Sequence, residues 1–298
     1  MIHFKINKST SLLILAAIIW GFAFVAQRAS MEHIGPYAFN GIRFALGALT
    51  LLPFSLILKT NSSIQHVYKS KHLKTGGLLA GIILFAGASF QQVGIVDTTA
   101  GNAGFITSLY VIMVPIIGLF WGHKTSFLTW VGVLFATVGL YFLSIQDKFT
   151  LSEGDSIVLL AALFFAFHVI IIGWYSNKTN PITLSIVQFS ICAVLSFIVS
   201  LFTEETSWSG IIEATIPLLY GGILSVGVAF TLQVIGQRKA TPATAAIILS
   251  FESIFAAVVG WILLNEIFTP RDILGSSLML TGIIISQIRM NKTYTEER

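Results

Sequence analysis

Apolar residues along the chain gather in ten long stretches that are separated by short polar segments. A helix that spans a bilayer needs about 20 mostly apolar residues, and the stretches are close to that length. The pattern therefore predicts an all-α polytopic membrane protein with ten transmembrane helices. Their expected bounds are Ser11–Ser30, Pro36–Leu58, Leu73–Val96, Gly101–Trp121, Leu128–Ile145, Asp155–Tyr175, Ile182–Phe202, Ile212–Ile235, Ala243–Leu264 and Ile273–Ile288.

The composition agrees with a chain that is embedded in a lipid bilayer. Of the 298 residues, 55% are hydrophobic and 10% are charged, and the mean hydropathy is +0.86. A soluble globular chain usually carries about 25% charged residues, so the polar surface is too small for a water-soluble particle. The formal charge of +4 is then attributed to cytoplasmic loops, and no nucleic-acid partner is expected.

Cysteine and metal-ligand patterns exclude several kinds of site. The single cysteine, Cys192, permits no intrachain disulfide, and its apolar neighbours predict a small buried hydrophobe. The chain shows no metal-ligand spacing, so neither a metal nor another cofactor is expected. Lys5 and Lys8 before the apolar run are similar to the start of a signal peptide. Because the run is long and many further spans follow it, we expect an uncleaved first helix.

The distribution of basic residues predicts the orientation. If the N-terminus is cytoplasmic, 13 of the 17 Lys and Arg residues fall in cytoplasmic segments. Only Arg28, Lys148 and Arg271 then lie in outside loops, and Arg43 lies within a helix. Cytoplasmic loops of membrane proteins carry such an excess of basic residues. We therefore expect a multi-pass protein of the inner (plasma) membrane with both termini in the cytoplasm.

The two halves of the chain, residues 1–149 and 150–298, repeat each other. The shift between matching positions stays between 142 and 145 residues across five helices. Matching pairs are Gln91 with Gln233, Thr99 with Thr241, Tyr110 with Glu252, Gly132 with Gly275, Gly139 with Gly282 and Arg43 with Gln188. Because each half has an odd number of spans, the halves are predicted to be inverted five-helix repeats. In secondary transporters with this design, the substrate site lies near the midplane between the repeats.

Glu252 is the sharpest candidate for a functional side chain. It lies about nine residues into the ninth expected helix, near the bilayer centre. An ionisable group there costs roughly 2.5–3.5 kcal/mol on insertion scales, so it must face a cavity or a partner. The carboxyl is a candidate for proton exchange with the substrate, and the alternative is a protonated group in a structural hydrogen bond. Its repeat mate Tyr110 either lines the same cavity or is an ordinary packed aromatic residue.

Six further residues are candidates for contact with the substrate. Arg43 either contacts an anionic group or takes a structural role by pairing with a carboxylate. Gln91, Gln92 and Gln233, near helix ends, offer amide groups to a substrate or to another helix. Trp20 lies too deep for an interfacial belt, so it faces a cavity or the packed core. A lone intramembrane histidine such as His168 is more often a satisfied core residue than a ligand.

The whole chain from about residue 10 to 290 resembles the two-repeat EamA type of the drug/metabolite transporter superfamily. The motifs that carry the resemblance are Trp20-Gly21, Arg43, the stretch from Gln92 through Thr98-Thr99-Ala100-Gly101-Asn102-Ala103-Gly104-Phe105-Ile106 to Pro115, Thr241-Pro242-Ala243, Ser250-Phe251-Glu252, Asn265-Glu266 and the pair Gly275 and Gly282. The resemblance implies a secondary carrier of amino acids, other metabolites or drugs, in many members an exporter.

The sequence thus predicts a non-enzymatic transporter that works by alternating access, with proton coupling through Glu252 as an option. Its expected partners are a small-molecule substrate, the lipid bilayer and protons, and it acts as a monomer or homodimer. An intramembrane enzyme would need a nucleophile with a base, a carboxylate pair or a metal motif at membrane depth, and none is apparent. A channel, or a membrane scaffold or receptor, is the other alternative.

Overall fold

The structure is a computed structural model that describes residues 8–59, 71–122, 125–144, 152–264 and 269–287. Every regular element in these ranges is a helix. Eight of the helical segments are long and apolar enough to cross a membrane. They are Lys8–Ser30, Pro36–Ser55, Lys71–Gly94, Ala100–Phe120, Glu153–Tyr175, Pro181–Thr203, Thr215–Gly236 and Pro242–Val259.

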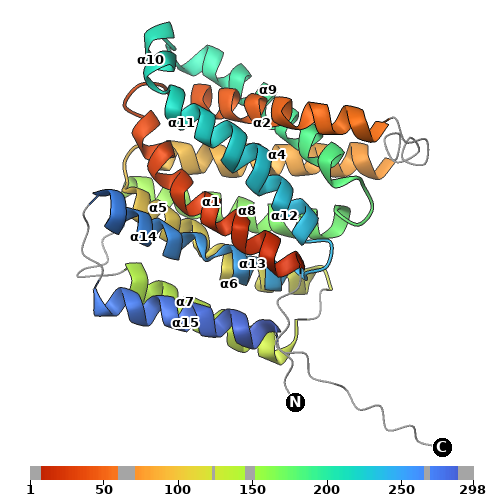
Figure 1. Cartoon of the computed structure of the whole chain (residues 1–298), viewed down its shortest axis with the longest axis vertical. Helices are drawn as coiled ribbons and strands as arrows, with labels where there is room; N and C mark the ends of the chain where they lie inside the picture. Colours follow the sequence, from red (N-terminus) through yellow and green to blue (C-terminus); the bar gives the residue numbers. More distant parts are fainter. Residues whose placement is uncertain (1–7, 60–70, 123–124, 145–151, 265–268, 288–298) are drawn as a thin grey trace, which may run out of the picture.

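Four of these segments are single unbroken helices, and a fifth is the first part of a longer unbroken helix. The unbroken ones are α1 (Lys8–Ser30), α4 (Lys71–Gly94), α8 (Glu153–Tyr175) and α9 (Pro181–Thr203), and the longer one is α2 (Pro36–Lys59). Two shorter apolar helices, α7 (Phe127–Ser144) and α15 (Pro270–Gln287), occupy the fifth and tenth predicted stretches. The start of α1 and the end of α15 lie on the same side of the bundle (Figure 1).

The fourth and ninth predicted helices are each broken in the middle. The fourth consists of α5 (Ala100–Ser108) and α6 (Tyr110–Phe120), and the ninth consists of α13 (Pro242–Leu249) and α14 (Glu252–Leu264). Both begin alike, because the side chain of a threonine accepts a hydrogen bond from the backbone N–H three residues later and caps the helix. These threonines, Thr99 and Thr241, are matching positions of the repeat. The interruptions therefore fall at the same place in each half.

The eighth predicted helix has the most irregular backbone. Its residues fall in the end of α10 (Trp208–Glu213), in α11 (Thr215–Leu219), in the π-helix η2 (Tyr220–Phe230) and in α12 (Thr231–Gly236). Pro217 has no N–H to donate to the carbonyl of Glu213, which is the residue where α10 ends. An 11-residue π-helix is rare, and π-helical segments occur frequently at functional sites.

Helix packing in one half has a counterpart in the other. The contact of α4 with α8 matches that of η2 and α12 with α1, and the contact of α2 with η2 matches that of α9 with α4. The contact of α1 with α13 and α14 matches that of α8 with α5 and α6. The helix pairs α2 with α9, and α7 with α15, each join matching helices directly, with the latter pair at one edge of the bundle (Figure 1).

Glycines set the close approach of α7 and α15. A Cβ on Gly139 would meet the carbonyl oxygen of Gly275, and a Cβ on Gly132 would meet that of Gly282. Gly275 is the repeat mate of Gly132, and Gly282 is the repeat mate of Gly139. Each glycine of α7 thus lies against the mate of the other α7 glycine, as two-fold symmetry between the helices requires. Small residues let helix backbones approach in this way in membranes.

Large apolar side chains cover the outside of the bundle. Phe120, Leu201, Phe202 and Ile216 are each more than 80% exposed. A soluble monomer rarely exposes apolar surface on this scale, whereas lipid chains provide a matching solvent. The described helices and their apolar exterior together make the chain a multi-pass membrane protein.

Candidate functional site

A cavity lies between the two halves of the helix bundle, with about 510 Å³ of space that protein atoms do not occupy, part of it open to the surroundings. Aromatic and amide side chains dominate its walls, which come from α1, α2, α4, α5, α6, α8, η2, α12, α13 and α14. The lining residues are Trp20, Phe24, Gln27, Arg43, Gln91, Thr107, Tyr110, Phe165, His168, Val169, Ser225, Phe230, Gln233, Leu249 and Glu252.

The lining is built largely from matching positions of the two halves. At shifts of 142 and 145 residues, ten of the lining residues form five pairs. The pairs are Trp20 with Phe165, Phe24 with Val169, Gln91 with Gln233, Thr107 with Leu249, and Tyr110 with Glu252. The cavity therefore lies where the halves meet, which is where inverted-repeat carriers bind substrate.

Glu252 is the first residue of α14, directly after the break in the ninth helical segment. Its side chain is only 4% exposed and reaches the cavity wall. The hydroxyl of Ser108 lies 3.5 Å from the carboxyl Oε1, at the limit of a hydrogen bond. Within the described ranges no basic side chain forms an ion pair with this carboxyl. The start of a helix favours a negative charge electrostatically.

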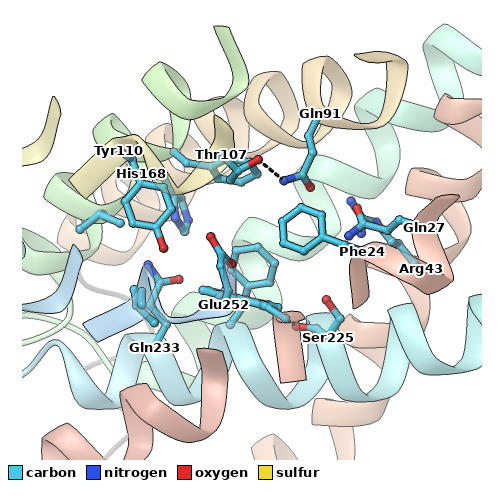
Figure 2. A pocket seen from close by; sticks show the side chains of 15 residues that line it. Phe24, Gln27, Arg43, Gln91, Thr107, Tyr110, His168, Ser225, Gln233 and Glu252 are labelled. Carbon is cyan, nitrogen blue, oxygen red and sulfur yellow. Dashed lines mark hydrogen bonds between the residues drawn. The ribbon is translucent and has the colours of Figure 1, made fainter. Parts of the chain in front are cut away.

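Tyr110 occupies the corresponding place in the first half, because it is the first residue of α6. Its side chain is buried, and its hydroxyl has no hydrogen-bond partner among the described residues. In Figure 2 the hydroxyl points into the space that it shares with Gln233 and Glu252. The hydroxyl nevertheless lies close enough to the carboxyl of Glu252 to interact with it, so the two matching residues act on the same part of the cavity.

Arg43 lies at the other end of the cavity from Glu252 and Tyr110 (Figure 2). Its Nη1 donates to Oε1 of Gln27 at 2.9 Å, and its Nε donates to Oδ1 of Asn40 at 2.9 Å. The guanidinium also lies 5.1 Å from the ring centroids of Phe39 and Phe44, within the range of cation–π attraction. The sequence left a structural ion pair open as its role, but no carboxylate of the described chain pairs with it.

The predicted amides divide between the cavity and the packed core. Gln233 lines the cavity, and its Oε1 has no partner among the described residues. Gln92 is fully buried and does not line the cavity, because its Nε2 donates to the backbone oxygen of Gln27 at 3.2 Å. The neighbouring Gln91 faces the cavity instead and donates to Thr107 at 3.0 Å.

Trp20 and His168 both reach the cavity wall while bonded to neighbouring helices. The indole Nε1 of Trp20 donates to the carbonyl oxygen of Ser225 within the π-helix at 3.2 Å. Nε2 of His168 lies 2.8 Å from Oε1 of Gln188. The histidine is thus hydrogen-bonded as a core residue would be, and its edge still contributes to the lining.

Sequence reasoning did not single out Phe24, Gln27, Phe165, Ser225 or Phe230. Phe165 is the repeat mate of Trp20, so the 145-residue shift applied to Trp20 would have identified it. Ser225 enters the wall through a π-helix, for which the sequence shows no separate signal. The predicted Asn265-Glu266 motif lies outside the described residues.

Comparison with known proteins places this architecture in a family. The model of the EamA-like transporter family matches the chain twice, over residues 7–145 and 152–287. An uncharacterized transporter of Archaeoglobus fulgidus is 36% identical over 284 residues, which cover 93% of this chain and 85% of the relative. The uncharacterized inner membrane transporter YedA of Escherichia coli is 22% identical, over 90% of this chain and 87% of the relative.

The fold agrees with a solved structure as well. A protein crystal structure with 15% sequence identity superposes with a TM-score of 0.77, covering 94% of this chain and 96% of the other. At this identity the likeness shows the fold alone. The repeat of the family model, the relative at 36% identity and the helical bundle together show that this chain belongs to the EamA-like transporter family.

Proposed function

We propose that this protein is a secondary active transporter that carries one small organic solute through the central cavity by alternating access. The observation that carries the proposal is the construction of the cavity from five matched pairs of residues, one member from each half. If the two halves exchange conformations, a cavity open to one side becomes open to the other. In this proposal α7 and α15 are the fifth and tenth spans of two inverted five-helix repeats, residues 1–149 and 150–298.

We assign the protein to export of metabolites such as amino acids, or of drugs, across the inner membrane. Relatives that are named as transporters support the class of protein, and one relative named as an inner membrane transporter supports the location in the inner membrane. The proposed substrate contacts and coupling group are Glu252, Tyr110, Gln233, Trp20, Arg43 and His168, with Gln91 in place of Gln92. The chain acts as a monomer or homodimer in the bilayer.

Proton coupling through Glu252 completes the proposal. The carboxyl faces the cavity, has no basic partner within the described ranges, and lies beside hydroxyl groups that tolerate either protonation state. A proton taken up by Glu252 when substrate leaves would couple the two movements as an antiport. The acidic and hydroxyl side chains of the cavity include no activated nucleophile, which disfavours the intramembrane enzyme.

Transport by purified protein in proteoliposomes tests the function. We expect saturable uptake of at least one member of a panel of labelled amino acids and organic acids, with exchange across the membrane when both sides hold substrate. Leu249→Trp places a larger side chain in the cavity and should abolish uptake. Leu201→Trp, on the lipid-facing surface, should leave uptake unchanged. Uptake that persists after Leu249→Trp would show that the substrate takes another route.

A further inference from the structure

The charges of the central cavity are separated along its length. Arg43 lies at one end, Tyr110 and Gln233 lie at the other, and Glu252 lies next to them, with the ring of Phe24 between it and Arg43 (Figure 2). The side chains of Arg43 and Glu252 are each less than 5% exposed. The cation and the acid of this cavity therefore do not neutralise each other.

The guanidinium of Arg43 has neutral neighbours in the described part of the chain. Its two hydrogen bonds go to the amide oxygens of Gln27 and Asn40, and the faces of Phe39 and Phe44 flank it. A guanidinium carries five N–H donors, so donors remain beyond these two bonds. A buried cation without a counter-charge is unfavourable, and an anion that entered the cavity would relieve that cost.

The charge at this position is not required by the packing that both halves share. The repeat mate of Arg43 is Gln188, a neutral residue that bonds to His168 at 2.8 Å. Both positions lie in matching helices, α2 and α9, which pack on each other. The second half has a neutral amide at the matching position, so the first half has a positive charge that the shared fold does not explain.

We propose that Arg43 is the substrate-binding residue for a carboxylate, and that the transported solute is a small organic acid whose apolar body packs against Trp20, Phe24 and Phe230. The planar fork of a guanidinium matches two carboxylate oxygens, and Gln27 and Asn40 hold that fork in place. The aromatic rings provide an apolar wall next to the charged end. This inference rests on the proposed transport function, since it names the class of solute that the same cavity takes.

Four related compounds separate the carboxylate from an amine. They are 3-phenylpropionate, 3-phenylpropionamide, phenylalanine and phenylalaninamide, which share one apolar body and differ in these two groups. Binding to the purified full chain in detergent is measured by the rise in melting temperature with ligand concentration. We expect each carboxylate to bind about 10- to 100-fold more tightly than its amide, as hydrogen bonds to a charged group imply. If phenylalanine binds more tightly than 3-phenylpropionate, the site also contacts the amine, and Glu252 is the acidic group of the lining that would bind it.

Gln27→Glu is the decisive variant. It has nearly the shape of the parent side chain, whose Oε1 lies 2.9 Å from Nη1, and it places an internal carboxylate on the guanidinium. We expect the preference for carboxylates over amides to disappear while the folded protein remains. Asn102→Asp adds the same charge at an exposed position outside the cavity lining and should retain the preference. Arg43→Lys should retain part of it.

Three results would overturn the inference: neither carboxylate stabilises the parent protein, the amides bind as tightly as the acids, or Gln27→Glu keeps the parental preference. The proposed transport function is judged separately, by saturable uptake into proteoliposomes. Carboxylate-selective binding without any uptake would support the site and contradict the transporter. Uptake of solutes without preference for a carboxylate would support the transporter and contradict the site.

Discussion

At the scale of single residues, the two halves place different chemistry at equivalent points. Glu252 and Tyr110 are each the first residue after the break in a helical segment, and both reach the cavity. Two similar frameworks thus present a carboxyl from one side and a phenol from the other. In the proposed mechanism the carboxyl is the member of this pair that exchanges a proton.

Glu252→Gln tests the proposed coupling. The amide keeps the shape of the side chain and can still meet the hydroxyl of Ser108, but it cannot release a proton. We expect substrate flux in proteoliposomes with an imposed pH gradient to fall to the level seen without a gradient, while exchange of substrate for substrate continues. Glu205→Gln, at an exposed acidic position, is the control and should respond as the parent does. A parental response in Glu252→Gln would remove the residue as the coupling site.

Most of the site residues that the sequence predicted line the cavity, because the depth of a residue in the membrane and its charge can be read from the sequence. Glu252, Arg43 and Trp20 stand out as polar or amphipathic side chains within apolar runs. The direction in which Gln92 points could not be predicted. Successive residues of an α-helix are rotated by about 100°, so of the neighbours Gln91 and Gln92 one faces the cavity and the other faces the core. The absence of a carboxylate partner for Arg43 in the described chain depends on tertiary packing, and the local sequence does not contain that information.

At the scale of helices, the expected positions agree with the structure to within a few residues for the unbroken segments. The apolar run predicted at Ser11–Ser30 is part of α1, and Ile182–Phe202 is part of α9. The breaks in the fourth and ninth segments and the π-helix were not predicted, because hydropathy is the same whether the backbone is α-helical, π-helical or interrupted. These irregular segments all contribute to the cavity, where exposed polar backbone is tolerated at membrane depth.

Glu204 connects two helices through a cap. It follows α9, and its carboxylate accepts hydrogen bonds at 2.8 Å from the backbone N–H groups of Tyr37 and Ala38 at the start of α2. Glu204→Ala should destabilise the protein by about 1–2 kcal/mol, as loss of a helix cap does, and lower the melting temperature in detergent. The exposed neighbour Glu205 forms no hydrogen bond in the described structure, so Glu205→Ala should leave the melting temperature unchanged. Equal effects of the two substitutions would contradict the cap.

The contact of α7 with α15 makes a second prediction at this scale. Gly139→Ala places a methyl group against the backbone carbonyl of Gly275, which cannot move away as a side chain would. We expect a loss of about 1–3 kcal/mol, as for other overpacked contacts, read as a lower melting temperature. Gly101→Ala is the matched control, because a methyl group there meets nothing within 4 Å. If both variants melt as the parent does, α7 and α15 do not pack in this way.

At the scale of the whole molecule, the start of α1 and the end of α15 lie on one side of the bundle (Figure 1). An even number of crossings has this consequence, and the concentration of Lys and Arg predicts that the side is cytoplasmic. Alkaline phosphatase fused to the C-terminus should therefore be inactive in a bacterial host. A fusion after Glu205, in the connection between α9 and α10, should be active. The opposite pattern would reverse the orientation, and activity in both fusions would contradict the count of ten spans.

Alternation between two states is the property that separates a carrier from a channel. The chain has one cysteine, so Cys192→Ser provides a background in which Gln27→Cys and Gln233→Cys report on opposite ends of the cavity. With the N-terminus in the cytoplasm, position 27 lies toward the outside and position 233 toward the inside. Labelling by a membrane-impermeant thiol reagent is measured from each side with and without a transported solute. In a carrier, conditions that increase labelling at one position decrease it at the other, because only one side of the cavity is open at a time. A channel would label at both positions together, and that result would contradict alternating access.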